Sequence, residues 1–283
     1  TLEADRRQRQ MCIRDRVMDV KYYLRERFFP HMWCAGCGHG IVLNALVRAV
    51  DGLGIKKRDM VMVSGIGCSS RISGYVDFHS LHTLHGRALA FATGVKLSKP
   101  SLNVIVPMGD GDALAIGGNH FFHAARRNIN ITALVMNNRT YGMTGGQFSP
   151  LSGVGTKATT APYSNIDREF DTVELAAGAG ATFVARTTVY HVKQLQSLLK
   201  KAISHNGFSV LEVLSQCPTY FGRKNRKGSA VDMMNSFKDG TVPVGSKKKQ
   251  DDPELIERGV FVEKILPEYC EAYAELVERA TAQ

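Results

Sequence analysis

Residues 104–138 read VIVPMGDGDALAIGGNHFFHAARRNINITALVMNN and carry the clearest topological signal in the chain. Two short apolar runs, 104–108 and 131–136, flank a segment, 113–127, with helical spacing. This pattern predicts a buried strand, a helix and a second buried strand. A Gly-Asp-Gly turn follows the first run and two asparagines follow the second. Because strands joined by a helix run parallel, we expect both turns at the same edge of one sheet.

The same alternation continues on either side of this segment. Further strands are predicted at 60–63, 182–184 and 210–214, and helices at 38–52, 86–97 and 191–205. We therefore predict an α/β fold, a parallel sheet with helices on both faces. Reactive residues follow the outer strands too, Gly65-Ile66-Gly67-Cys68 after one and Cys217-Pro218 after another. Ligands of such sheets bind at the carboxyl ends of the strands, so we predict a single composite site there.

Composition narrows the function classes. The 283 residues contain six cysteines and carry a formal net charge of +10. The chain has neither an apolar run of about 20 residues, as a membrane helix requires, nor a recognisable signal peptide. We therefore expect a cytoplasmic protein with reduced cysteines and no membrane contact. The basic residues are dispersed and form no nucleic-acid module, so an acidic protein or anionic small molecules are the expected partners.

The chain divides into three predicted regions. Residues 1–17 are basic and lack periodicity, which is typical of a disordered or non-native leader. Residues 18–228 contain every candidate motif. Residues 229–283 are predicted to form a C-terminal arm with a helix over 254–280, which either packs against a partner or is a solvated tail.

Cys34 and Cys37 form a C-x-x-C pair, and Cys68 and Cys217 are single cysteines further along the chain. Thiolates with this spacing bind a structural zinc ion or an iron–sulfur cluster if the fold brings the four together. From the spacing alone zinc is the commoner occupant, so both interpretations stay open at this point.

Asp110 lies between two glycines at the end of one predicted strand, and Asn138 follows the next strand. A carboxylate, an amide oxygen and a backbone carbonyl make a hard oxygen site for Mg²⁺, which keeps its other positions for diphosphate oxygens. The glycines let the backbone approach phosphates closely. The alternative for the tripeptide alone is an ordinary β-turn.

Several motifs together resemble a known family. The Gly-Asp-Gly turn, the 25 intervening residues and the Asn-Asn pair resemble the thiamine-diphosphate signature. The β subunits of 2-oxoacid:ferredoxin oxidoreductases are similar in four further segments between about residue 33 and residue 227, namely WCAGCGHG (33–40), IGCSSR (66–71), LHGRA (84–88) and TYGMTGGQ (140–147). Residues 149–154 depart from the usual family pattern.

The resemblance implies the thiamine-diphosphate-binding fold, specifically its diphosphate-binding module. It also implies three bound groups: thiamine diphosphate, Mg²⁺ on Asp110, Asn138 and the Thr140 carbonyl, and one [4Fe–4S] cluster on Cys34, Cys37, Cys68 and Cys217. The residues implied to bind the cofactor are Ile66, Gly67, Ser69, His85, Gly109, Asp110, Gly111, Asp112, Asn138, Tyr141, Gly142, Met143 and Thr144.

Two residues are implied to take part in catalysis. Arg71 stands where the family places a cation that receives the 2-oxoacid carboxylate, and its guanidinium can pair bidentately. The sequence Cys-Ser-Ser-Arg is more similar to the 2-oxoglutarate-directed members than to the pyruvate-directed ones. A structural ion pair is the alternative for Arg71. His85 resembles the family's cofactor-proximal histidine, which hydrogen-bonds the diphosphate or the reacting carbonyl.

The implied activity is the reversible, coenzyme A-dependent oxidative decarboxylation of 2-oxoglutarate, with electrons passed to ferredoxin. A cluster accepts electrons whereas zinc does not, which favours the cluster. The chain is too short to include the second, pyrimidine-binding module, so we expect an α subunit and a dimer of αβ heterodimers. The alternatives are pyruvate or branched 2-oxoacids as substrates, a non-redox thiamine lyase with structural zinc, and an electron-transfer or assembly module without activity of its own.

Overall fold

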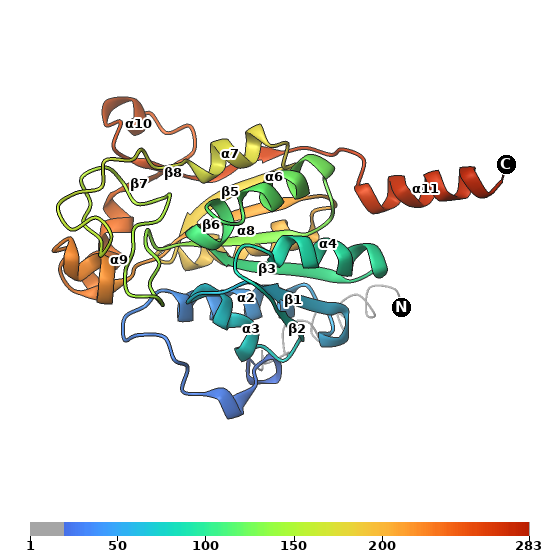
Figure 1. Ribbon diagram of the computed structural model, residues 1–283, viewed down its shortest axis with the longest axis horizontal. Coiled ribbons are helices and arrows are strands. Elements are labelled where there is room, and N and C mark those ends of the chain that lie inside the picture. Colours follow the sequence, from blue (N-terminus) through green and yellow to red (C-terminus); the bar gives the residue numbers. More distant parts are fainter. Residues whose placement is uncertain (1–19, 283) are drawn as a thin grey trace, which may run out of the picture.

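The computed structural model describes residues 20–282, so the predicted leader at residues 1–17 lies outside the described residues. Eight strands form one sheet in the order β2-β1-β3-β4-β6-β5-β8-β7 (Figure 1). Neighbouring strands are parallel except β8, which is antiparallel to β5. The predicted α/β fold with a parallel sheet is therefore confirmed. The strands are β1 (Met60–Ser64), β2 (His79–His82), β3 (Asn103–Gly109), β4 (Thr132–Asn137), β5 (Phe183–Thr188), β6 (Ser209–Leu214), β7 (Thr241–Pro243) and β8 (Ile256–Glu263).

Helices connect the strands and cover both faces of the sheet. The α-helices are α2 (His39–Gly52), α3 (Ile72–Tyr75), α4 (Ala88–Ser98), α5 (Asp110–Leu114), α6 (Gly118–Arg127), α7 (Thr172–Gly178), α8 (Val192–Ser204), α9 (Ala230–Asp239), α10 (Lys248–Asp251) and α11 (Tyr269–Thr281). Shorter turns are η1 (Val20–Tyr23), η2 (Glu26–Phe28), η3 (Lys57–Asp59), η4 (Ser69–Arg71) and the π-helical η5 (Pro218–Gly222). No helix formed by residues 20–282 has the length and apolar content needed to cross a membrane.

The strand sequences explain why both faces are covered. Alternate residues of a strand point to opposite faces. Met60 and Met62 of β1 pack in one core with α2 and α8, whereas Val61 and Val63 pack in a second core with α4, α6 and α7. Every residue of β1, β4, β5 and β6 is buried, so these strands are mainly β-branched and apolar rather than alternating. The charged exceptions, Arg186 and Glu212, pair with each other.

Strand register brings the motifs to one edge. Gly109 at the end of β3 pairs with Met136 of β4, and Asn137 at the end of β4 pairs with Leu214 at the end of β6. The strands β2, β1, β3, β4 and β6 are neighbours in the sheet. The segments that follow their carboxyl ends therefore lie next to one another, as the sequence predicts.

Two predicted helices differ from the structure. The helix predicted over 254–280 is wrong, because residues 256–263 form β8 and only Tyr269–Thr281 is helical. β8 lies between Pro253 and Pro267, contains β-branched and aromatic residues and pairs with β5. Pairing with the sheet therefore decides its conformation, not the helical spacing of its residues. The helix predicted over 113–127 is interrupted between α5 and α6, where Gly117 packs against Gly86.

The edges of the sheet were less predictable than its centre. β2 has an exposed, largely polar sequence and was not predicted. The division of the chain at residue 228 stays a prediction, although β8 joins the main sheet and α11 extends away from the body (Figure 1).

Candidate active site at the carboxyl edge of the sheet

A cavity of about 220 Å³ lies at the carboxyl edge of β1, β3 and β4. We call it the cofactor cavity. Every residue that the sequence implied to bind the cofactor lines it. The full lining is His39, Ile66, Gly67, Cys68, Ser69, His85, Gly109, Asp110, Gly111, Asp112, Met136, Asn138, Thr140, Tyr141, Gly142, Met143 and Thr144. The strand-end segments therefore converge on one cavity, although their roles stay predictions.

Asp110 is the first residue of α5 and only 2% exposed. The Ser149 hydroxyl donates a hydrogen bond to its carboxylate at 2.5 Å. Burial raises the pKa of Asp110 to about 7, although the hydrogen bond from Ser149 acts in the opposite direction. No described Lys, Arg or His side chain forms an ion pair with Asp110. A buried carboxylate with this environment gains from a bound cation. Asn138 and Thr140 line the same cavity and complete a set of oxygen donors suited to Mg²⁺.

Asp112 is equally buried but has a different set of partners. The ring Nδ1 of His85 lies 2.7 Å from its Oδ1 atom, and the backbone N–H of Gly86 donates to the same oxygen at 2.7 Å. The adjacent Asp112 carboxylate raises the pKa of His85, and this outweighs the opposite effect of burial. Asp112 therefore fixes the orientation of His85 at the cavity wall.

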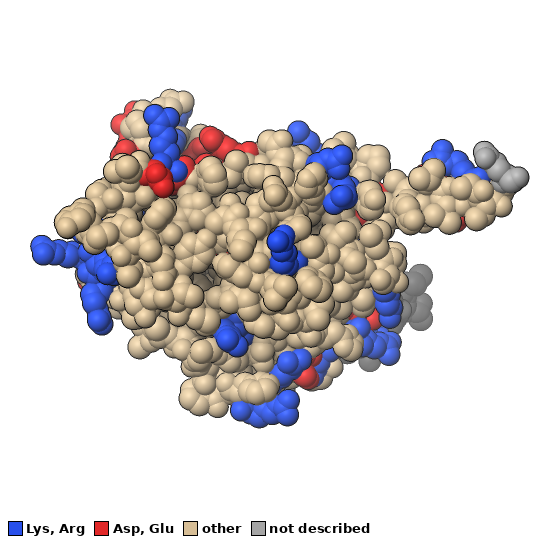
Figure 2. All heavy atoms as spheres, in the orientation of Figure 1, with Lys and Arg blue, Asp and Glu red and all other residues tan. Residues whose placement is uncertain are grey.

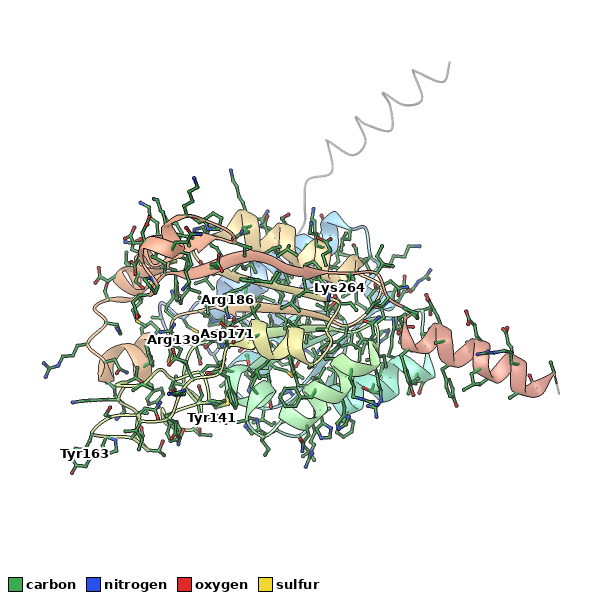
Figure 3. All side chains as sticks on the ribbon, turned by 90° about the horizontal axis from the view of Figure 1, so that it is seen from above. Arg139, Tyr141, Tyr163, Asp171, Arg186 and Lys264 are labelled. Atoms are coloured by element: carbon green, nitrogen blue, oxygen red, sulfur yellow. The ribbon has the colours of Figure 1, made fainter. Side chains whose placement is uncertain are left out.

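The loop after β4 forms the opposite wall. Arg139 adopts a left-handed conformation with φ of 59°, and Tyr141 pairs with Gln147 in an isolated antiparallel bridge. The Tyr141 ring packs so closely on Gly111 that a Cβ atom there would lie 2.2 Å from the ring. Burial raises the pKa of Tyr141 to about 12, so the phenol stays protonated. Figure 3 labels Arg139 and Tyr141 in this loop.

A second cavity, of about 230 Å³, is lined by Cys34, Cys37, Cys68 and Cys217. We call it the cysteine cavity. It shares Cys68, Asn138, Gly142 and Met143 with the cofactor cavity, so the two cavities are adjacent. All four thiols are free. Burial raises the pKa of Cys37 to about 12 and that of Cys68 to about 11, and the nearby thiols add to both shifts.

Hydrogen bonds hold the cysteine segments together. The indole N–H of Trp33 donates to the Cys68 carbonyl at 2.7 Å, and the Gln216 side chain donates to the Gly36 carbonyl at 3.0 Å. Among residues 20–282, no three His, Cys, Asp or Glu side chains are placed to bind one metal ion. The four thiols do line one cavity, so the fold brings them together as the sequence predicted.

Arg71 does not line the cofactor cavity. It lies at the end of η4 and borders a third cavity of about 570 Å³, together with Arg25, Tyr75 and His82. The guanidinium is exposed and no described carboxylate pairs with it. The structural ion pair weighed for Arg71 is thus not formed within residues 20–282, and its role toward a substrate stays a prediction.

Sequence reasoning missed two residues of the site. His39 is buried at the wall of the cofactor cavity, with Nδ1 3.3 Å from the Ser215 hydroxyl, and burial lowers its pKa to about 4. Its position two residues after Cys37, in the turn that follows the C-x-x-C pair, could have indicated that it lies at the site. Ser149, the donor to Asp110, belongs to the segment 149–154 that departs from the family pattern, so no motif indicated it.

Comparison with known proteins agrees with this geometry. Residues 65–213 match the family model described as thiamine pyrophosphate enzyme, C-terminal TPP binding domain. The chain is 50% identical over 268 residues to the 2-oxoglutarate synthase subunit KorB of Methanothermobacter marburgensis, covering 93% of each chain. It is 47% identical over 264 residues to the KorB subunit of Methanocaldococcus jannaschii, covering 92% of this chain and 98% of that one.

The fold is also similar to a solved structure. That structure is the 2-oxoglutarate:ferredoxin oxidoreductase from Magnetococcus marinus, with 2-oxoglutarate, coenzyme A and succinyl-CoA bound. The TM-score is 0.85 at 35% sequence identity, over 94% of this chain and 92% of that chain. This chain therefore belongs to the family of 2-oxoglutarate synthase KorB subunits, the β subunits of 2-oxoacid:ferredoxin oxidoreductases.

Proposed function

We propose that this chain is the β subunit of a 2-oxoglutarate:ferredoxin oxidoreductase. In the forward direction, 2-oxoglutarate, coenzyme A and two oxidised ferredoxins give succinyl-CoA, CO₂, one proton and two reduced ferredoxins. The observation that carries the proposal is the adjacency of the cofactor cavity and the cysteine cavity, which share four lining residues. A carbon-chemistry site and a metal site in direct contact suit a reaction that releases electrons.

We propose that Asp110, Asn138 and the Thr140 carbonyl hold Mg²⁺, and that the cavity walls hold thiamine diphosphate. The buried Asp110 carboxylate, with no cationic partner among the described side chains, supports the cation. His85 retains a proton more readily than an ordinary histidine, which suits a hydrogen-bond donor to an anionic oxygen. When bound, thiamine diphosphate supplies the carbanion chemistry of decarboxylation.

We propose a [4Fe–4S] cluster on Cys34, Cys37, Cys68 and Cys217. Four thiols around a cavity of about 230 Å³ suit a cluster better than a zinc ion, whose ligands close around a single point. A cluster supplies one-electron transfer, which zinc cannot. The non-redox lyase with structural zinc is therefore not favoured.

The relatives are named as subunits, one of them as subunit beta of a 2-oxoacid:ferredoxin oxidoreductase. We therefore propose an α subunit that supplies the pyrimidine-binding module, in a dimer of αβ heterodimers. We propose ferredoxin as the electron acceptor and the cytoplasm as the location, where free thiols persist. Arg71 would bind a carboxylate of 2-oxoglutarate from the third cavity, which also contains Arg25 and shares Met32 with the cysteine cavity.

Co-expression with the α subunit under anaerobic conditions tests the proposal. We expect activity only in the complex, with kcat/KM for 2-oxoglutarate at least roughly tenfold above that for pyruvate or branched 2-oxoacids. The variant Arg71→Gln should raise the KM for 2-oxoglutarate, whereas Arg58→Gln, another exposed arginine outside all cavities, should not. Equal rates with pyruvate and 2-oxoglutarate would contradict the proposed preference for 2-oxoglutarate. Full activity of this chain alone would contradict its proposed role as a subunit.

A further inference from the structure

We propose that a cluster of exposed basic residues beside the cysteine cavity is the docking surface for a small acidic electron-carrier protein. The cluster consists of Lys157, Arg223, Lys224, Arg226 and Lys227, and we call it the basic rim. The inference rests on the proposed function, because it assumes that electrons leave through the cysteine cavity. It adds the surface at which the carrier binds.

The backbone ties the basic rim to the cysteines. Cys217 is followed by η5, whose last residue, Gly222, donates its N–H to the Cys217 carbonyl at 2.9 Å. Lys227 donates its N–H to the Gly222 carbonyl at 3.0 Å. Residues 223–227 therefore form a turn that follows η5, whose residues Pro218, Thr219 and Tyr220 line the cysteine cavity.

The far end of the same segment contacts the C-x-x-C turn. A Cβ atom on Gly36, between Cys34 and Cys37, would lie 2.3 Å from the Cβ of Ala230. The basic turn is thus fixed at one end to Cys217 and at the other to the Cys34–Cys37 loop. Because Cys34 is itself exposed, the cysteine cavity reaches the surface on this side of the molecule.

The rim is held in place by hydrogen bonds, and its side chains form no ion pairs among the described residues. The Asn225 side chain accepts a hydrogen bond from the backbone N–H of Lys157 at 2.7 Å. It also donates one to the backbone carbonyl of Lys157 at 3.0 Å. Arg226 is held in a left-handed conformation with φ of 51°. None of the five side chains forms an ion pair with a described Asp or Glu. The nearest acidic residue along the chain is Asp232. It forms the capping box of α9 with Ser229, the N-cap residue.

Figure 2 shows Lys and Arg atoms gathered at the end of the molecule where α9 lies in Figure 1. Other Lys and Arg atoms lie along the lower edge of this face, and acidic and basic atoms are mixed where α10 lies. Five exposed cations without ion-pair partners among the described residues are unsuited to the core of an obligate subunit interface, from which charged residues are depleted. They suit a transient partner of opposite charge, since electrostatic attraction accelerates encounter and orients the partner before contact. Electron-transfer interfaces are small and of this kind.

A charge-reversal experiment tests the docking surface. In the reconstituted αβ complex, the variant Arg223→Glu/Lys224→Glu is compared with Lys99→Glu/Arg127→Glu. The control makes the same change of charge at the ends of α4 and α6, before β3 and β4, on the opposite edge of the sheet. Each enzyme is assayed with an acidic ferredoxin and with a neutral zwitterionic viologen, which needs no protein docking.

We expect kcat/KM for ferredoxin to fall at least about tenfold in the rim variant at low ionic strength, with a flatter salt dependence. The rate with viologen should stay within about twofold of wild type, and the control should match wild type with both acceptors. Unchanged ferredoxin kinetics would overturn the proposal. A parallel loss with both acceptors, or loss of the α subunit on gel filtration, would also overturn it by assigning the rim to folding or assembly. An inactive wild-type complex with viologen would instead contradict the proposed function.

Discussion

At the scale of single residues, two carboxylates separated by one glycine have different environments. Asp110 and Asp112 are equally buried, yet of the two only Asp112 has a histidine beside it. Asp110 accepts from a serine hydroxyl and from backbone N–H groups, and it lines the cavity. We therefore propose that Asp110 binds a cation and that Asp112 orients His85.

The variant Asp112→Asn should lower the pKa of His85. The wild-type carboxylate stabilises the protonated ring, and a neutral amide removes most of that attraction. Since the pair stabilises the fold while His85 is protonated, the stability advantage of wild type should be largest at acidic pH. It should shrink as pH rises through the pKa of the folded protein. The pKa of His85 is measured by following the imidazole NMR signals from pH 5 to 8, with His85→Gln to assign them. An unchanged pKa in Asp112→Asn would refute the pairing.

The variant Gly111→Ala should weaken thiamine diphosphate binding at least about tenfold, because its methyl group would overlap the Tyr141 ring and displace a cavity wall. Gly118→Ala is the matched control, since a Cβ there would meet only Phe122, at 3.9 Å. Calorimetric titration of the αβ complex with thiamine diphosphate and Mg²⁺ gives both affinities. Equal affinities in the two variants would show that Tyr141 does not shape the site.

At the scale of elements, a buried network joins the cofactor loop to the sheet. Arg186 on β5 pairs with Glu212 on β6 at 2.5 Å and with Asp171, the N-cap of α7, at 2.7 Å. Asn137 at the end of β4 donates to the other oxygen of Glu212 at 2.9 Å. Figure 3 shows Asp171 and Arg186 side by side, with Arg139 nearby. The network fixes the strand end that precedes Asn138.

The variant Asp171→Asn should destabilise the protein by about 1 kcal/mol at pH 7, a value reduced because Asp171 is partly exposed. Asparagine keeps the helix cap, so the loss reports the ion pair. Partial burial raises the pKa of Asp171, but Arg186 outweighs this and lowers it overall. The stabilisation is thus present above pH 4 and disappears as pH falls through the pKa of the folded state.

Urea unfolding at pH 7, 5, 4 and 3 measures this difference. Glu174→Gln, an exposed change in the same helix, is the control and should have little effect at any pH. A difference between wild type and Asp171→Asn that does not depend on pH would argue against the ion pair.

The central strands could be predicted because each one has a recognisable pattern in its own residues. The apolar runs of β1, β3, β4 and β6 cannot be solvent-exposed, and the motifs follow them directly. β2 and β8 were missed because their strand conformation depends on pairing with β1 and β5, which no local pattern encodes. The placement of Arg71 in a neighbouring cavity was likewise unpredictable, since it depends on the path of η4 after Cys68.

At the scale of the whole molecule, segments far apart in the sequence line one cavity, which we propose as the electron-transfer site. Cys34 and Cys217 are separated by most of the fold in sequence but line one cavity, which adjoins the cofactor cavity through Cys68. The basic rim covers the same end of the molecule. Substrate chemistry, electron exit and carrier docking are therefore proposed to follow one path across the carboxyl edge of the sheet.

The most direct test of this path is the visible absorption of the anaerobic αβ complex before and after addition of 2-oxoglutarate and coenzyme A. We predict a brown iron–sulfur absorption that the substrates partly bleach. It should be absent in Cys217→Ser and retained in Cys270→Ser, a buried thiol outside the cysteine cavity. A colourless complex containing zinc, or an absorption that the substrates leave unchanged, would contradict the account.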